Sequence, residues 1–171
     1  LHRVDRRQRQ MCIRDRKYGS TPAQSVENRK RLSQMGSDLG FAFNFSDDTR
    51  MQNTFAAHQL LTWAQVQGLQ HPLKMALFDA HFTQGHNVND PEVLADVAAS
   101  VGLDRTEALE VLSSGSFAEQ TREAQQFWTS RGISGVPSMI FEGKYLITGA
   151  QGADNYAQIL RKVLEERDAA A

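Results

Sequence analysis

The sulfur chemistry open to this chain is limited, because Cys12 is its single cysteine. Thiol–disulfide exchange needs an attacking thiolate and a second thiol that resolves the mixed disulfide, usually as Cys-x-x-C at a helix N-terminus. Cys12 lies in Met-Cys-Ile-Arg-Asp-Arg, with no strand pattern before it and no helical pattern after it. We therefore assign no catalytic residue to this chain, and no intrachain disulfide can form.

Other chemistry-bearing residue types do not fall at functional spacings. His81 and His86 are five residues apart, which puts them on different faces of a helix, and no His-Glu-x-x-His pattern occurs. The sequence also lacks a Gly-rich phosphate loop and a serine in a nucleophile-elbow context. It therefore predicts no metal site and no organic cofactor.

The stretch from Gly135 to Gly149 is the most informative part of the chain. Met139 to Phe141 and Tyr145 to Ile147 are short runs typical of strands, and the intervening Glu142-Gly143 indicates a hairpin. Pro137 cannot donate to a strand ladder, so we expect it to open the first strand. A helical pattern follows, with one face formed by Tyr156, Ile159, Leu160 and Val163.

The elements before this hairpin read as helices. Ser20 or Thr21 is expected to cap the first helix, whose apolar stripe is Leu32, Met35 and Leu39. A connector containing Phe41, Phe43 and Phe45 follows. Five further helices are predicted by apolar spacing, caps and glycine stops: from Asp47 or Asp48 to Gly68, then to Gly85, from Asp90 to Gly102, from Asp104, and from Ser116 to Gly132. Trp63 and Trp128 are expected in the core.

This order of strand, turn, strand and helix resembles the C-terminal half of a thioredoxin fold. Val136-Pro137 stands at the head of the hairpin, and Gly149-Ala150-Gln151 stands at its exit. More narrowly, Lys17 to Glu166 resembles the DsbA-like oxidoreductases of the FrnE type. The resemblance implies an α/β, thioredoxin-like fold with an inserted all-helical domain. The N-terminal β-α-β half would be missing, which leaves the chain predominantly helical. Further residues that carry the resemblance are Asn53-Thr54, Ala57-His58, Leu60-Leu61 and Trp63-Ala64.

The resemblance also implies the site residues. It implies a cis peptide bond at Val136-Pro137, in a loop that faces an N-terminal Cys-x-x-C pair. Val136 and Pro137 would bind an extended substrate through the backbone, a form of strand addition. Asn53 and His58 would lie at the edge of the active-site groove. His58 also fits a boundary residue that forms only local hydrogen bonds.

Domain organisation follows from the same patterns. Residues 1–16 contain six Arg and two Asp without a sustained period, and they read as a non-native or disordered basic arm. The string MCIRDR looks like translated adaptor or vector sequence, so we expect the native gene to be truncated just before Lys17. Residues 17–132 would form the connector and helical insertion domain. Residues 133–171 would form the C-terminal hairpin and helix of the thioredoxin core.

Composition excludes several classes of function. The chain has no apolar run near the roughly 20 residues of a membrane span and no secretion signal, which favours a cytoplasmic protein without a membrane partner. The net charge is -1, and the part after the basic arm is mildly acidic, so a nucleic-acid partner is not expected. The expected partners are protein or small-molecule thiols and disulfides.

Three functions remain open. The first is a fragment of a DsbA-family thiol–disulfide oxidoreductase, without redox turnover because the Cys-x-x-C segment is absent. The second is a glutathione-dependent isomerase or transferase of the hydroxychromene-carboxylate isomerase or kappa type, in which a serine replaces the cysteine pair and glutathione is the cofactor. The third is a non-catalytic module that binds peptides.

Overall fold

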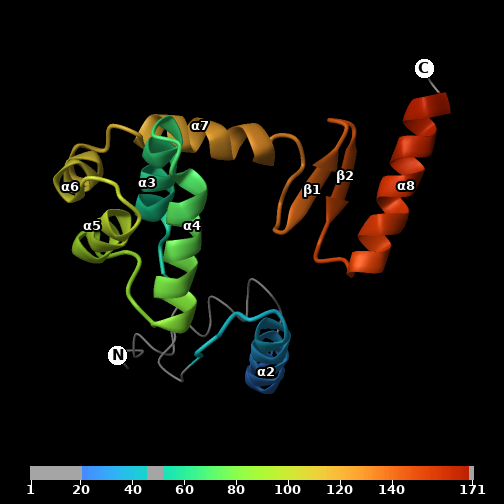
Figure 1. Cartoon of the computed structure of the whole chain (residues 1–171), viewed down its shortest axis with the longest axis horizontal. Coiled ribbons are helices and arrows are strands. Elements are labelled where there is room, and N and C mark those ends of the chain that lie inside the picture. The colour runs from blue at the N-terminus through green and yellow to red at the C-terminus, as the bar shows by residue number, and fades with distance from the viewer. Residues whose placement is uncertain (1–20, 46–51, 170–171) are drawn as a thin grey trace, which may run out of the picture. The chain divides into compact units, whose positions relative to one another are not determined.

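In a computed structural model of the protein, residues 21–45 and 52–169 are described, and the chain divides into two compact units. The first unit ends at Thr121, and the second begins at Arg122. The helices of the first unit are α2 (Pro22–Asp38), α3 (Phe55–Val66), α4 (Gln70–Phe78), the π-helix η1 (Asp79–Thr83), α5 (Pro91–Ser100) and α6 (Arg105–Ser114) (Figure 1). The division falls inside α7 (Ala118–Thr129), and β1 (Ser138–Phe141), β2 (Tyr145–Thr148) and α8 (Ala153–Ala169) follow.

The core of the first unit lies between α3, α4, α5 and α6, which are grouped together in Figure 1. Leu60, Leu73 and Leu94 come from three of these helices and are completely buried. Burial of each such side chain contributes about 1.5 to 3 kcal/mol to folding. Trp63 is also buried here, as the sequence predicted. The helical block therefore has a continuous apolar core of its own.

Side-chain caps begin three helices of this unit. Thr21 and Gln24 form a reciprocal capping box, in which the Thr21 hydroxyl accepts from the Gln24 amide at 3.2 Å. The Asp90 carboxylate accepts from the Glu92 amide at 3.0 Å, and the Asp104 carboxylate accepts from the Glu107 amide at 2.9 Å. These bonds satisfy backbone donors that the first turn of a helix leaves free. All three caps were predicted from the sequence.

Four helices, α2, α3, α5 and α7, end with one backbone motif. A glycine with positive φ follows the cap, and its amide donates to the carbonyl three residues back. The next residue is apolar, and its amide donates to the carbonyl five residues back, which completes a Schellman motif. The glycine and apolar pairs are Gly40-Phe41, Gly68-Leu69, Gly102-Leu103 and Gly132-Ile133.

The packing face of α2 differs from the prediction. Leu32, Met35 and Leu39 were expected to form its buried stripe, yet all three are exposed, Leu39 by 85%. The helix instead turns the buried Gly36 toward the aromatic connector, and the Ser33 hydroxyl donates to the Phe43 carbonyl at 3.1 Å. The reason is steric: a ring packs against the helix only where no Cβ stands in the way.

The connector itself is held by its aromatic side chains, as expected. The Phe43 ring lies 5.5 Å from that of Phe45 and 5.3 Å from that of Phe82, centroid to centroid. The Asn44 amide donates to the Phe82 carbonyl at 2.9 Å, and the Thr83 hydroxyl donates to the Ala42 carbonyl at 2.7 Å. The connector is thereby tied to the end of η1.

Two predicted helix starts were wrong, and one predicted helix changes type before its end. The helix expected from Asp47 or Asp48 begins as α3 at Phe55, because the Asn53 carboxamide accepts from the Phe55 amide and forms a turn first. The helix expected to continue to Gly85 changes at Asp79 into the π-helix η1. Ser116 does not cap α7, which begins at Ala118.

The second unit contains an antiparallel hairpin and α8. Ser138 pairs with Thr148, and Phe141 pairs with Tyr145. Glu142 and Gly143 both have positive φ, and the Lys144 amide donates to the Phe141 carbonyl at 3.0 Å, as in a type I′ turn. The sequence prediction of this hairpin is confirmed.

The apolar face of α8 is narrower than predicted. Val163 is buried and Ile159 is half-buried, whereas Leu160 is exposed. The Tyr145 hydroxyl donates to the Glu166 carboxylate, which ties β2 to the C-terminal part of the helix.

Trp128 of α7, expected in the core, is 44% exposed and lies edge to face against Phe127.

None of the helices in residues 21–45 and 52–169 combines the length and the apolar character that crossing a bilayer requires.

Candidate functional site

The candidate site is the loop that enters β1, from Gly135 to Ser138. The Val136–Pro137 peptide bond is cis. The Ser138 hydroxyl donates to the Gly135 carbonyl at 2.8 Å, and the Gly149 amide donates to the Pro137 carbonyl at 2.9 Å. These two bonds fix the loop on both sides of Val136 and join it to the end of β2.

Val136 is almost fully exposed, at 92% for the residue as a whole. Within the described residues, neither its N–H nor its C=O forms a hydrogen bond, although the backbone on its C-terminal side is paired from Pro137 onward. An exposed residue with a free donor and a free acceptor at the head of a strand is a template for a further extended chain.

Hydrogen bonds fix the backbone just after β2, which is joined to the loop through Gly149. The Tyr156 hydroxyl, projecting from α8, lies 3.3 Å from both the Gly149 carbonyl, to which it donates, and the Gln151 amide, from which it accepts. The Gln151 carboxamide also donates to the Thr148 carbonyl at 3.2 Å. Sequence reasoning placed Tyr156 only on an apolar face and missed this role. Its signal was a phenol seven residues beyond a glycine that ends a strand, since buried tyrosines need a partner for the hydroxyl.

Asn53 lies in the first unit, directly before α3. Its side chain is exposed, and its oxygen accepts from the Phe55 amide at 3.0 Å. This bond satisfies one of the free donors at the start of the helix. The structure therefore gives Asn53 a local role in starting α3, and its carboxamide nitrogen points to no bonded partner among the described residues.

His58 lies one turn later in α3. Its backbone follows the helix, with the amide donating to the Thr54 carbonyl and the carbonyl accepting from the Thr62 hydroxyl at 3.0 Å. The residue reaches solvent, yet partial burial of the ring lowers the pKa of His58 below its ordinary value. The neutral imidazole is thereby favoured, which suits a hydrogen-bonding group better than a fixed cation.

The predicted site residues thus form two pairs. Val136 and Pro137 belong to the second unit, and Asn53 and His58 belong to the first, so each pair is described within its own unit. Cys12, the chain's single cysteine, lies outside the described residues, and those described contain no thiol. They also contain no grouping of three or more His, Cys, Asp or Glu side chains fit to hold a metal ion. The loop can present a backbone edge, and it carries no thiol.

The fold places the chain in a known structural class. A probable DsbA oxidoreductase from Streptomyces coelicolor matches it with a TM-score of 0.80 and 28% identity, over 89% of this chain and 65% of that structure. A putative protein disulfide isomerase from Nitrosomonas europaea shares the fold, with a TM-score of 0.63 and 19% identity over 86% of this chain and 76% of that structure. The protein therefore has a DsbA-like thioredoxin fold, and it is predominantly helical, as predicted.

The sequence comparisons give the family. The model of the DSBA-like thioredoxin domain matches residues 5–161, and the chain belongs to that family. The thiol:disulfide interchange protein DsbA of Azotobacter vinelandii is 29% identical over 114 residues, which is 66% of this chain and 53% of that protein. The chain spans about half the length of this relative and of the corresponding Pseudomonas aeruginosa protein.

Proposed function

We propose that this chain provides the substrate-side loop of a DsbA-family thiol–disulfide oxidoreductase of the FrnE type. The observation that carries the proposal is the free backbone N–H and C=O of the exposed Val136, at the head of β1. Membership of the DSBA-like family supports it, as do the helices inserted before the hairpin. Because main-chain bonds do not depend on side chains, the loop would accept many extended substrates.

The exchange reaction would proceed through thiols that lie elsewhere. A thiolate attacks one sulfur of a substrate disulfide, the other sulfur leaves as a thiolate, and a second thiol then displaces the bound sulfur and restores a disulfide. Cys12 is the chain's single cysteine and has no second thiol to resolve such an intermediate. We infer that the chain binds substrate without redox turnover.

A backbone-directed variant tests the binding role. The probe is a short extended peptide with a central S-methylcysteine, which cannot exchange, titrated against the ¹⁵N-labelled chain. Val136→Pro removes the N–H, whereas Val136→Ala keeps it and removes most of the exposed side chain. We expect Val136→Pro to weaken binding by about fivefold to tenfold, because one hydrogen bond contributes about 1 kcal/mol, and Val136→Ala to bind nearly as the parent chain.

Two results would count against the loop. One is an equal loss in both variants, which would show recognition of the side chain rather than the backbone. The other is the absence of saturable shifts at the amides of Val136 and Ser138 in the parent chain. Unchanged amide shifts along β1 and β2 in each variant show that the hairpin is intact.

A turnover assay tests the inferred inactivity. The chain should not accelerate the reduction of insulin by dithiothreitol above the uncatalysed rate, and Cys12→Ser should behave identically. Acceleration that disappears in Cys12→Ser would refute the inference. The similarity to the thiol:disulfide interchange proteins of Azotobacter vinelandii and Pseudomonas aeruginosa favours this reading over the glutathione-dependent alternative.

A further inference from the structure

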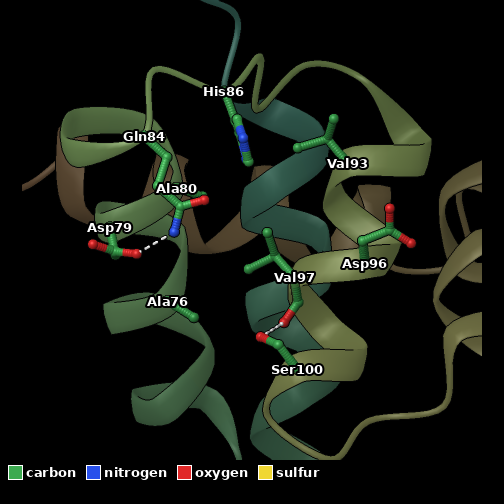
Figure 2. A pocket seen from close by; sticks show the side chains of 9 residues that line it. All are labelled: Ala76, Asp79, Ala80, Gln84, His86, Val93, Asp96, Val97 and Ser100. Atoms are coloured by element: carbon green, nitrogen blue, oxygen red, sulfur yellow. Dashed lines mark hydrogen bonds between the residues drawn. The ribbon is translucent and has the colours of Figure 1, made fainter.

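A cavity of about 320 Å³ lies in the first unit between α5 and the α4–η1 helix (Figure 2). It is formed entirely within the helical block and shares no residue with the loop at Val136. The volume falls at the lower end of the range for ligand pockets, roughly 300 to 1,000 Å³. The nine lining residues are Ala76, Asp79, Ala80, Gln84, His86, Val93, Asp96, Val97 and Ser100.

The π-helix builds one wall of this cavity. Its wide turn is closed by the Gln84 amide, which donates to the Asp79 carbonyl at 3.0 Å, and by the His86 amide, which donates to the Ala80 carbonyl at 2.8 Å. Figure 2 shows the His86 side chain reaching down into the gap between the two helices. A regular continuation of α4 would carry Gln84 and His86 along its own axis instead. Single π-turns of this kind are frequent at functional sites.

Four of the lining residues are small and aliphatic. Ala80 is buried, and Ala76, Val93 and Val97 are half-buried. Side chains of this size leave room for a narrow hydrocarbon body and offer it apolar contacts. None of them can hydrogen-bond a ligand through its side chain, so the polar groups around them decide which ligands fit.

Apart from His86, whose ring has at least one N–H donor, the polar groups are mainly acceptors. Asp79 and Asp96 are the acidic lining residues, although Figure 2 shows the Asp96 carboxylate turned away from the gap between the helices, and the lining includes no Lys and no Arg. The Ser100 hydroxyl already donates its proton to the Val97 carbonyl at 2.7 Å, so its oxygen is left only as an acceptor. Gln84 donates one of its amide hydrogens to Asp79, which leaves its own oxygen free.

The charged side chains of α5 and of the α4–η1 helix near the cavity include more carboxylates than cations. Arg105 donates to Asp96 at 2.7 Å and to Glu92 at 2.6 Å, so one cation serves two carboxylates at the α5 side. Asp79, on the opposite wall, has no cationic partner among the described residues. The cavity thus combines small aliphatic side chains with hydrogen-bond acceptors and with the Asp79 carboxylate, which no cation pairs within the described residues.

We propose that this cavity binds a small amphipathic cation: an ammonium or guanidinium group on a short hydrocarbon body. The head group donates to Asp79 and to the Gln84 oxygen, which lie together on the α4–η1 side of the cavity, and the body lies on the small aliphatic residues. A free organic amine has this chemistry, and so does the side chain of Lys or Arg on another polypeptide. The proposal does not depend on the thiol–disulfide function of the family.

The test titrates the ¹⁵N-labelled chain with butylguanidine and with n-butylamine, and with n-butanol as the neutral control. A short blocked peptide containing one Arg distinguishes a polypeptide source from a free cation. We expect saturable shifts confined to the amides of residues 76–100, and no matching shifts with n-butanol. Asp79→Asn, which keeps the shape of the side chain, should weaken butylguanidine binding by about tenfold.

The matched control is Glu110→Gln, which neutralises an exposed carboxylate of α6 outside the cavity and should leave binding unchanged. Ala76→Leu fills the cavity and should abolish binding; if that variant does not fold, Asp79→Asn still decides. Equal shifts with n-butanol, or equal weakening by Asp79→Asn and Glu110→Gln, would overturn the proposal. Tighter binding of the Arg peptide than of butylguanidine would support it and identify a polypeptide as the source.

Discussion

Replacing Gly36 by Ala should destabilise α2, although the same change normally stabilises a helix. In an exposed helix interior, Gly→Ala contributes about 1 kcal/mol of stability. At Gly36, a Cβ would lie 2.6 Å from the Phe41 carbonyl oxygen and 2.5 Å from Phe43 Cδ2. The chain would have to move apart by roughly 1 Å to restore ordinary contact distances.

Little freedom exists for such a movement. The Phe41 amide donates to the Gly36 carbonyl at 2.7 Å, and the Phe43 carbonyl accepts from Ser33, so both ends of the contact are bonded to α2. Overpacking of this kind costs about 1 to 3 kcal/mol. Set against the gain in helix propensity, the expected net effect is a loss of about 1 kcal/mol.

Native-state hydrogen exchange of the α2 amides measures this effect where it acts, because exchange reports the free energy of local opening. The matched control is Ser37→Ala, one residue further along on the exposed side of α2. This change should raise the free energy of local opening by about 0.5 kcal/mol and so slow exchange. Slower exchange in Gly36→Ala, of the size seen in Ser37→Ala, would refute the steric account of how α2 meets the connector.

Three further predictions concern the core, the hairpin and pH. Leu94→Ala, in the centre of the first unit, should lower the free energy of unfolding by about 2 to 5 kcal/mol in urea, whereas Val66→Ala at an exposed site should change it by less than about 0.5 kcal/mol. Glu142→Asn should slow hydrogen exchange along β1 and β2, because Asn tolerates the positive φ of 52° better than Glu; faster exchange would contradict the turn assignment. Burial lowers the pKa of His58 in the folded chain, so below the ordinary value of 6.5 the unfolded chain takes up the proton first and stability falls with falling pH. His58→Gln should remove that part of the decline. A pKa of His58 above 6.5, measured from the midpoint of an NMR titration, would contradict the prediction.

Much of the helical block could be predicted from local chemistry. Asp90, Asp104 and Thr21 cap helices through bonds to residues two or three positions away, so their roles are readable without knowledge of the fold. The hairpin was readable for the same reason, because Glu142-Gly143 specifies its turn locally. Trp63 of a predicted helix was expected in the core, and it is buried.

The errors arose where distant contacts decide the outcome. The face that α2 buries depends on a ring from Phe43, seven residues beyond Gly36, and no spacing rule within the helix contains that information. The π-turn at Asp79 likewise depends on contacts that periodicity does not encode. Of the candidate site, Val136-Pro137 could be found through a family resemblance, whereas the bracing hydroxyl of Tyr156 and the cavity beside η1 could not, since both require the packed helices.

The shared endings of four helices have a consequence for engineering. Because glycine and the apolar residue after it stop each helix through backbone bonds, helix length is set independently of the side chains that fill the interior. A combinatorial library that randomises buried positions such as Leu60 and Leu94, and that keeps the four terminating pairs, should preserve the C-terminal ends of α2, α3, α5 and α7. The block is therefore a scaffold whose interior composition and segment lengths can be varied separately.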